Sequence, residues 1–224
     1  MTCTSDHIFL LQTIVEKVVI KNKNLLYAVF IDFKRAYDTV DRRKLFRRHW
    51  FHRFQDIGIN GPFLKNLKSM YETVSCKIKL KDSHLDPIKS NLGLKQGCPL
   101  SPMMFNLYID DIKDDAQCDP VTITDTKISH FLYADDLVVV SLSPEGLQRS
   151  LDKISNYATT KSLIISIKKS KSMIFNTGGR LINGEVLEPV KSFCYLGFQV
   201  VPSGIVTYDK ERQKSFASIA RCYR

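Results

Sequence analysis

The stretch that decides the fold is His130-Phe-Leu-Tyr-Ala-Asp-Asp-Leu-Val-Val-Val-Ser141, in which Asp135 and Asp136 separate two apolar runs. The β-branched and aromatic residues on both sides predict two strands joined by a tight turn. Two adjacent carboxylates at the tip of a partly buried hairpin repel each other, so either one is protonated or a divalent cation lies between them. A solvated Asp-Asp turn is the alternative, but apolar residues run directly up to the pair. We therefore expect a metal site here.

A third aspartate ends another strand-like run, Ala28-Val-Phe-Ile-Asp32, and a helix-like stretch follows it. Hard oxygen ligands suit Mg²⁺, which shares its coordination shell among one or two carboxylates, waters and substrate phosphates. The carboxylates of Asp32 and Asp135 meet only if their strands lie side by side in one sheet. The sequence thus predicts a sheet that assembles a two-metal site for phosphoryl transfer.

Five sequence blocks, in this order and spacing, resemble the reverse transcriptases, and most closely those of non-LTR (LINE-like) retrotransposons. Residues 6–17 also resemble the helix that precedes the first catalytic strand of those enzymes, so the resemblance covers nearly the whole chain. The blocks are Phe30-Ile-Asp-Phe-Lys-Arg-Ala-Tyr-Asp38, Gly93-Leu-Lys-Gln-Gly-Cys-Pro-Leu-Ser-Pro102 with Phe105-Asn106, Tyr133-Ala-Asp-Asp136, Ser162 to Phe175, and Tyr195-Leu-Gly197.

The resemblance implies RNA-directed DNA polymerase activity, a nucleotidyl transfer in which a DNA primer 3′-hydroxyl attacks a dNTP on an RNA template. Asp32, Asp135 and Asp136 are then the catalytic carboxylates and the ligands of two Mg²⁺ ions, or of Mn²⁺ in their place. Asp136 is usually the most indirect of the three ligands in this family. The backbone carbonyl of Phe33 would complete the metal shell.

Tyr37 falls at the steric-gate position of the family, where an aromatic ring beneath the sugar disfavours a 2′-hydroxyl. The resemblance therefore implies a preference for deoxynucleotides. Tyr37 could also be a packed helix aromatic, and the two roles are compatible because a gate must be held rigidly.

The loop over residues 93–102 precedes a helix-like run. Gly97 permits a close approach of the backbone, and Ser101 is a candidate N-cap. By resemblance, Gln96 and Gly97 line the incoming nucleotide and the template base. Cys98 stands where many relatives have Asp, and we expect it to be a small packing residue.

Three lysines, Lys168, Lys169 and Lys171, lie in the strand-like segment that runs from 163 to 175. A positioned cation or acid assists the leaving pyrophosphate, and Lys169 best matches the usual lysine of the family. Solvated strand-end charges are an equally good interpretation of any one of them. Two departures from the family pattern in this region are Ser162, where relatives often carry Gly, and Ser166, where they often carry Asn.

Tyr195, Leu196 and Gly197 lie between apolar residues that predict a hairpin. The hairpin resembles the primer grip, which holds the primer end near the metals. An ordinary hairpin is the alternative interpretation.

The composition favours a polyanionic partner. The 224 residues carry 33 Lys and Arg against 23 Asp and Glu, a net charge of +10, and the 44% hydrophobic content suffices for a core. Cations and aromatics alternate most densely over residues 41–54, which predicts either a nucleic-acid contact or an amphipathic helix with a solvated basic face. Residues 47–54 make this stretch longer than expected and could be an insertion.

The sequence gives little support for a zinc site, a secretory signal or a membrane-spanning segment. The six cysteines form no Cys-x-x-Cys pair, and the five histidines, His49 and His52 among them, lack zinc spacing. The N-terminus does not resemble a secretory signal, and no apolar run reaches the ~20 residues that span a bilayer. We expect a protein of the nucleus or cytoplasm that does not associate with membranes.

Strand-like runs joined by hairpins predict an α+β fold, with helices on one face of an antiparallel sheet. The order of elements resembles a polymerase palm with partial fingers and a truncated thumb. We expect residues 1–200 to form the palm and partial fingers, and residues 201–224 to begin the thumb with a helix that opens at Thr207. Helices are expected over 6–20, 42–54, 62–73, 101–112 and 144–161, and strands over 27–31, 75–80, 86–92 and 128–141.

The fingers hairpin and most of the thumb of the family have no counterpart in this sequence, and neither does a LINE-type endonuclease domain. We expect a fragment whose missing parts a longer parent protein supplies. The first hypothesis is an active polymerase domain, and the second is a catalytically silent retroelement remnant that binds nucleic acid. The third is an RNA-directed RNA polymerase or another palm-like nucleotidyltransferase, which should carry a smaller or polar residue at position 37.

Overall fold

The computed structural model describes residues 4–46, 54–55, 58–72, 74–80, 83–115, 119–123, 125–175, 180–182, 185–187, 189–202 and 206–208. The chain forms two compact units. The first consists of residues 1–33, 112–156 and 165–224, and the second of residues 34–111 and 157–164.

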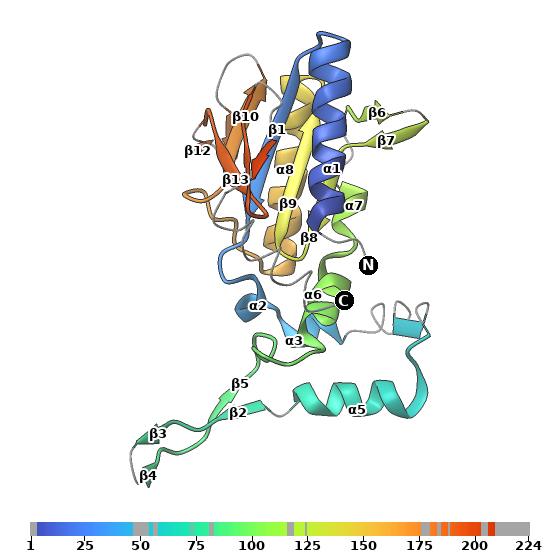
Figure 1. Ribbon diagram of the computed structural model, residues 1–224. Helices are drawn as coiled ribbons and strands as arrows, with labels where there is room; N and C mark the ends of the chain where they lie inside the picture. Colours follow the sequence, from blue (N-terminus) through green and yellow to red (C-terminus); the bar gives the residue numbers. More distant parts are fainter. Residues whose placement is uncertain are drawn as a thin grey trace, which may run out of the picture. The chain divides into compact units, whose positions relative to one another are not determined.

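A four-stranded antiparallel sheet forms the centre of the first unit (Figure 1). Its order, β10-β1-β9-β8, places β1 between two strands that lie far from it in sequence. The sheet together with its helices confirms the predicted α+β class. The strands are β1 (Leu26–Asp32), β8 (His130–Tyr133), β9 (Asp136–Ser141) and β10 (Lys171–Phe175).

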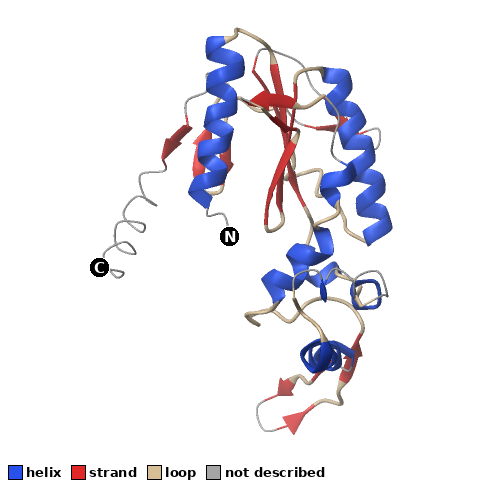
Figure 2. Ribbon diagram, turned by 90° about the vertical axis from the view of Figure 1, so that its right-hand side faces the viewer, coloured by secondary structure: helices blue, strands red, loops and turns tan. Residues whose placement is uncertain are grey.

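Two helices cover opposite faces of this sheet, α1 (Thr4–Val15) and α8 (Pro144–Lys161) (Figure 2). Phe30 of β1 packs on the α1 side, in one cluster with apolar residues of that helix. Its neighbour Val29, which points to the other face, is fully buried as well. A strand that is buried on both faces needs cover on both. The prediction that the helices lie on one face is therefore wrong.

A small sheet of β13, β14 and β15 contributes Tyr195 and Phe198 to the α1-side core. Thr207 and Tyr208 belong to β15, so the predicted thumb helix does not open at Thr207, and residues 209–224 lie outside the described residues. The remaining elements of this unit are η1 (Glu16–Lys21), α7 (Ile112–Asp115), β6 (Val121–Ile123), β7 (Thr126–Ile128), β11 (Arg180–Ile182), β12 (Glu185–Leu187), β13 (Phe193–Tyr195), β14 (Phe198–Val200) and β15 (Val206–Tyr208).

The second unit is held together by a buried arginine. Arg42 donates hydrogen bonds to the carbonyl of Tyr71 at 3.1 Å, to Ser90 Oγ at 3.1 Å and to the carbonyl of Leu92 at 2.5 Å. It thereby joins three segments of this unit. The elements are α2 (Ala36–Thr39), α3 (Arg42–Leu45), α5 (Gly61–Glu72), α6 (Ser101–Ile109), β2 (Val74–Cys76), β3 (Lys79–Leu80), β4 (Ser83–His84) and β5 (Ile88–Ser90).

Several expected helix boundaries differ from the observed ones. The helix expected over 42–54 is described as α3 at its start, and positions 47–53, with His49 and His52, lie outside the described residues. Ser101 is not an N-cap: it is the first residue of α6, and its hydroxyl donates to the carbonyl of Lys95 at 2.6 Å. Among the described residues, the structure has no helix long and apolar enough to cross a membrane.

Candidate active site

The register of the central sheet brings two of the predicted carboxylates together. Asp32, the last residue of β1, pairs directly with Asp136, the first residue of β9. Directly paired residues of antiparallel strands project to the same face, with Cβ atoms about 4.5–5.5 Å apart. Phe30 and Val138, which also pair with each other, are buried on this same face. They lie two residues farther from the strand ends than Asp32 and Asp136. The two aspartates thus continue an apolar row at the point where the strands end.

The third carboxylate lies in the turn between β8 and β9. Tyr133 pairs with Asp136, which leaves Ala134 and Asp135 as a two-residue connection. Ala134 has φ 52°, a left-handed conformation that is uncommon for a residue with a Cβ. Strained backbone of this kind concentrates at functional sites, where the surrounding structure enforces it. The turn holds Asp135 close enough for its charge to act on both Asp32 and Asp136.

A turn after α8 fixes the backbone of Asp32. The Asp32 N–H donates to Ser170 Oγ at 3.1 Å, and the Ser166 N–H donates to the Asp32 carbonyl at 2.8 Å. The segment expected to be a strand from residue 163 onward is a strand only from Lys171, because residues 167–169 form this turn. As a result, Lys169 Nζ lies 3.7 Å from Asp32 Oδ2 and forms an ion pair with it. Neither Lys168 nor Lys171 has an ion pair with Asp32 among the described contacts.

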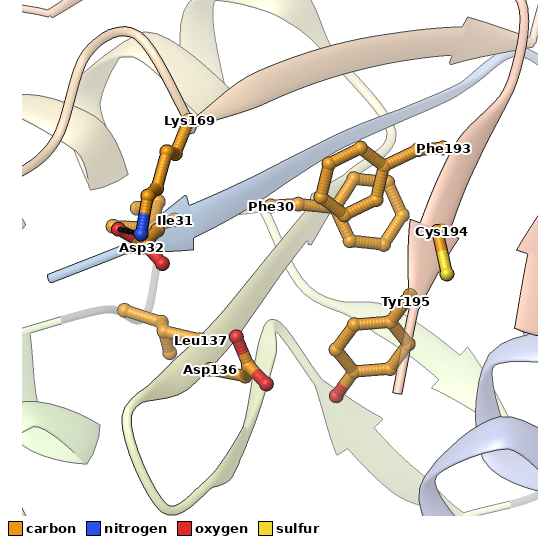
Figure 3. Close-up of a pocket in the computed structure, with 9 residues that line it drawn as sticks. All are labelled: Phe30, Ile31, Asp32, Asp136, Leu137, Lys169, Phe193, Cys194 and Tyr195. Carbon is orange, nitrogen blue, oxygen red and sulfur yellow. Dashed lines mark ion pairs between the residues drawn. The ribbon is translucent and has the colours of Figure 1, made fainter. Parts of the chain in front are cut away.

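The carboxylates border a pocket of about 310 Å³. Phe30 stacks on Phe193, with ring centroids 4.6 Å apart, and lies 5.4 Å from the ring of Tyr195. Figure 3 shows the Tyr195 hydroxyl directed toward the side of the pocket where Asp136 lies. The hydroxyl oxygen is buried and has no hydrogen-bond partner among the described residues. The lining residues are Phe30, Ile31, Asp32, Asp136, Leu137, Lys169, Phe193, Cys194 and Tyr195.

The predicted primer-grip residues form the turn of the β13–β14 hairpin. Tyr195 pairs with Phe198, and Leu196 and Gly197 connect the strands with φ values of 48° and 87°. Tyr195 is 3% exposed. The turn therefore presents a rigid aromatic residue to the pocket.

Burial and the repulsion between charges raise the pKa of Asp32 and of Asp136. Burial raises the pKa of Asp32, as does the charge of Asp135, while Lys169 and a hydrogen bond from the Ser166 hydroxyl oppose the rise. Burial and the charges of Asp135 and Asp32 raise the pKa of Asp136 to about 6. Burial and the nearby Asp136 also raise the pKa of Tyr195. The site has an excess of negative charge that a cation would neutralise.

The donor atoms fit a divalent metal that also binds substrate. Asp32 Oδ2 is buried and accepts no hydrogen bond from the described residues, and its charge is balanced by the ion pair with Lys169 at 3.7 Å. Within the described ranges, no three His, Cys, Asp or Glu side chains converge to form a complete metal site. Mg²⁺ is commonly held by one or two carboxylates together with water and substrate phosphates, so a partial protein shell matches its chemistry.

Three of the four predicted nucleotide-binding residues, Tyr37, Gln96 and Gly97, line a second pocket, of about 450 Å³, within the second unit. The fourth, Phe33, is a buried residue of the first unit and does not line this pocket. Tyr37 is half-buried and stacks on Phe105 with ring centroids 4.7 Å apart. Gln96 Nε2 donates to Asp38 Oδ1 at 2.9 Å. The pocket is lined by Tyr37, Lys95, Gln96, Gly97, Cys98, Pro99, Ser101 and Pro102.

Gly97 and Cys98 of this pocket have distinct physical properties. Gly97 has φ 79° and open space where a Cβ would lie, so the backbone conformation, not crowding, requires glycine. Cys98, predicted to be a small packing residue, is half-buried and lines the pocket. A hydrogen bond from the backbone of Leu100 lowers the pKa of its thiol, with help from Ser101 and Tyr71.

The sequence interpretation missed several supporting residues. Ser170, which is fully buried, fixes the backbone of Asp32, and Phe193 supplies part of the pocket wall. The position of Ser170 directly after Lys169 was the only signal available.

The two departures from the family pattern also have structural counterparts. Ser162 has φ 60°, where glycine would be unstrained, and Ser166 hydrogen-bonds to Asp32.

Comparison with known proteins agrees with this geometry. Residues 2–200 match the family described as reverse transcriptase (RNA-dependent DNA polymerase). The chain is 26% identical over 173 residues to the transposon TX1 uncharacterized 149 kDa protein of Xenopus laevis, a match that covers 75% of this chain and 13% of that protein. It is 28% identical over 186 residues to the retrovirus-related Pol polyprotein from type-1 retrotransposable element R2 of Popillia japonica, covering 75% of this chain and 26% of that protein.

The fold is similar to that of telomerase from Candida tropicalis, solved in complex with the TWJ fragment of telomeric RNA. The TM-score is 0.67 at 17% identity, over 92% of this chain and 33% of that chain. The chain thus spans about a quarter or less of the length of the two retroelement relatives. Because the family match extends over most of its residues, the chain belongs to the reverse transcriptase (RNA-dependent DNA polymerase) family, among the non-LTR retrotransposon proteins.

Proposed function

We propose that the chain is the palm of an RNA-directed DNA polymerase, with residues 1–200 forming the palm and part of the fingers. The observation that carries the proposal is the direct pairing of Asp32 with Asp136, beside a turn that holds Asp135. Reverse transcriptases generally depend on divalent metal ions. A sheet that places Asp32 and Asp136 at the edge of a pocket, with Asp135 in the adjoining turn, supplies carboxylate ligands for that chemistry.

Asp32, Asp135 and Asp136 would hold two Mg²⁺ ions, or Mn²⁺, and the carbonyl of Phe33 would complete the shell. When bound, the ions would activate the primer 3′-hydroxyl and stabilise the charge of the leaving pyrophosphate. Asp32 Oδ2, which accepts no hydrogen bond from the described residues and already attracts the cation of Lys169, supports this assignment, and so does the raised pKa of Asp136, because a metal ion would stabilise both groups.

Lys169 would donate a proton to the leaving pyrophosphate, or stabilise its negative charge with the ammonium group. Its side chain is 73% exposed, so its ion pair with Asp32 contributes little to stability. An exposed lysine that is close to a catalytic carboxylate remains available to substrate. The ion pair with Asp32 favours Lys169 over Lys168 and Lys171 for this role.

The hairpin of Tyr195, Leu196 and Gly197 would grip the primer end. Tyr195 is fixed by aromatic neighbours and presents an unpaired hydroxyl to the pocket that Asp136 borders. A buried hydroxyl without a partner is costly, and a bound nucleic acid would satisfy it.

Tyr37, Gln96 and Gly97 would bind the incoming dNTP and the template base. Their convergence in one pocket supports a shared role. The stacking of Tyr37 on Phe105 restricts its ring, as a steric gate against a 2′-hydroxyl requires.

The expected partners are an RNA template, a DNA primer and dNTPs. The net charge of +10 favours binding to these polyanions. The curated relatives are longer proteins, so further fingers, thumb or endonuclease segments would come from a longer parent. We propose the nucleus or cytoplasm as the location, because RNA templates and dNTPs are found there.

The test is Mg²⁺-dependent extension of a DNA primer on an RNA template by the full chain. The control is the double variant Asp135→Ala/Asp136→Ala. Extension by the wild type but not by the control supports the proposal. Retained nucleic-acid binding without extension indicates a catalytically silent remnant, and extension with ribonucleotides in preference to deoxynucleotides indicates an RNA-directed RNA polymerase.

A further inference from the structure

A two-stranded ribbon in the second unit separates basic from apolar side chains. β2 pairs with β5 so that Ser75 lies opposite Lys89, and β3 pairs with β4 (Figure 1). Between these ladders, the N–H of Leu85 donates to the carbonyl of Ile78 at 3.0 Å, and residues 85–87 lie opposite residues 77 and 78, so the second segment has one extra residue there.

The alternation of side chains along this ribbon defines two faces. Ser75 of β2 and Lys79 of β3 are joined by the short segment that holds Lys77, and alternation along this segment directs all three to the same face. Lys89 joins them there because it pairs with Ser75. All four are exposed. The opposite face carries exposed apolar side chains instead, at Ile78 (46% exposed), Leu85 (47%) and Ile88 (58%).

The lysine face, defined as Lys77, Lys79 and Lys89, carries charge that its surroundings do not neutralise. None of the three forms an ion pair or a cation–π contact with another described residue. Asp86 is the one acidic side chain within the described residues of the ribbon, 74–80 and 83–90. Lysines two residues apart on a strand are separated by about 6.5 Å, close enough to contact neighbouring phosphates of one nucleic-acid strand.

We propose that the lysine face binds the phosphate backbone of the template–primer nucleic acid, at a site separate from the carboxylate pocket. The inference rests on the proposed function, which supplies the polyanion. Exposed ammonium groups along an extended ribbon, without an ion-pair partner among the described residues, suit contacts to phosphate that fix position without reading sequence. A protein partner would instead be favoured by the apolar face, which lies on the other side of the ribbon.

Salt dependence measures this contact directly. Each phosphate that a lysine neutralises releases counterions, and the slope of log K against log [salt] changes by about 0.9 for duplex and about 0.7 for single-stranded nucleic acid. Removal of three lysine contacts should therefore reduce the slope by about two to three. The loss should be similar for different sequences of the same nucleic acid.

The experiment compares the full chain with the variant Lys77→Gln/Lys79→Gln/Lys89→Gln. The matched control is Lys23→Gln/Lys127→Gln/Lys153→Gln, which removes the same charge from three exposed lysines of the first unit. Fluorescence anisotropy with an RNA–DNA hybrid, single-stranded RNA and single-stranded DNA, each from 50 to 300 mM KCl, gives the slopes. Thermal unfolding of each variant verifies that it is folded.

We expect the ribbon variant to lose about two to three units of slope on at least one of these nucleic acids, while the control keeps the wild-type slope. Equal slopes for the ribbon variant and the wild type would overturn the inference, as would an equal loss in the control. Primer extension by the wild type separates the two proposals. If the wild type extends the primer but the ribbon variant keeps the wild-type salt slope, only the proposed phosphate contact of the lysine face is rejected. If binding depends on the three lysines but the wild type does not extend the primer, only the proposed polymerase activity is rejected.

Discussion

Asp136 destabilises the metal-free protein, and its replacement by asparagine measures by how much. The Asp136 carboxylate is half-buried, pairs with Asp32 and lies beside Asp135, and its pKa is raised to about 6. Asparagine has nearly the same shape and no charge. We expect Asp136→Asn to be more stable than the wild type at pH 7.5 in EDTA, although the variant should lose polymerase activity.

The magnitude follows from the pKa. A rise from 3.8 to about 6 is about two pKa units, or about 3 kcal/mol at 1.36 kcal/mol per unit. Because Asp136 is only half-buried, solvent screens part of this repulsion, and we expect a gain of about 1–2 kcal/mol. The folded protein binds this proton more tightly than the unfolded chain. The penalty is therefore absent below about pH 4, grows as the pH rises to about 6 and is complete above that.

Urea unfolding at pH 4 and pH 7.5 tests both the size and the sign of this effect. Asp125→Asn, which removes an exposed carboxylate at the β6–β7 turn, is the control. The Asp136→Asn midpoint should exceed the wild-type midpoint at pH 7.5 and match it at pH 4. An Asp136→Asn protein that is equally or less stable at pH 7.5, or one whose gain persists at pH 4, would refute the electrostatic account of the site.

Three further substitutions test individual roles. Tyr37→Ala should raise the incorporation of ribonucleotides relative to deoxynucleotides, and an unchanged ratio in primer extension would remove the gate assignment. Lys169→Gln should slow single-turnover extension by about 100-fold or more, whereas Lys168→Gln should stay near the wild-type rate; equal rates would show that neither lysine assists the leaving group. Tyr195→Phe should stabilise the metal-free protein by about 1 kcal/mol in urea unfolding, because the hydroxyl lacks a partner among the described residues, yet weaken primer binding. Loss of stability in this variant would mean that the hydroxyl is already satisfied.

The carboxylate site was predictable because Asp32 and Asp136 lie at the ends of apolar strands and Asp135 lies in the turn beside them. Asp32 follows the apolar residues of β1, and Asp136 precedes those of β9. Their positions at the strand ends were therefore visible in the sequence. The need to bring the carboxylates to one metal site supplied the pairing of the two strands. Helix α8 was predicted with its boundaries, since Ser143 accepts a hydrogen bond from the N–H of Gly146 at 3.0 Å and caps the first turn.

Contacts between distant segments determined the features that the sequence did not reveal. The apolar run after residue 163 favours a strand, but the turn at 167–169 is stabilised by its contacts with Asp32 and interrupts it. Ser101 has a capping side chain, yet a tertiary hydrogen bond to Lys95 engages it instead. The second helix-covered face of the sheet was missed because continuous apolar strands do not specify which elements cover them.

Binding of Mn²⁺, followed by electron paramagnetic resonance, tests the central claim most directly, because it does not depend on turnover. The wild type, Asp32→Asn and the control Asp125→Asn would be titrated in the presence of dNTP. The account predicts binding by the wild type and the control, and loss of at least tenfold in affinity in Asp32→Asn. Equal Mn²⁺ affinity in all three proteins would contradict a metal site built on Asp32, Asp135 and Asp136.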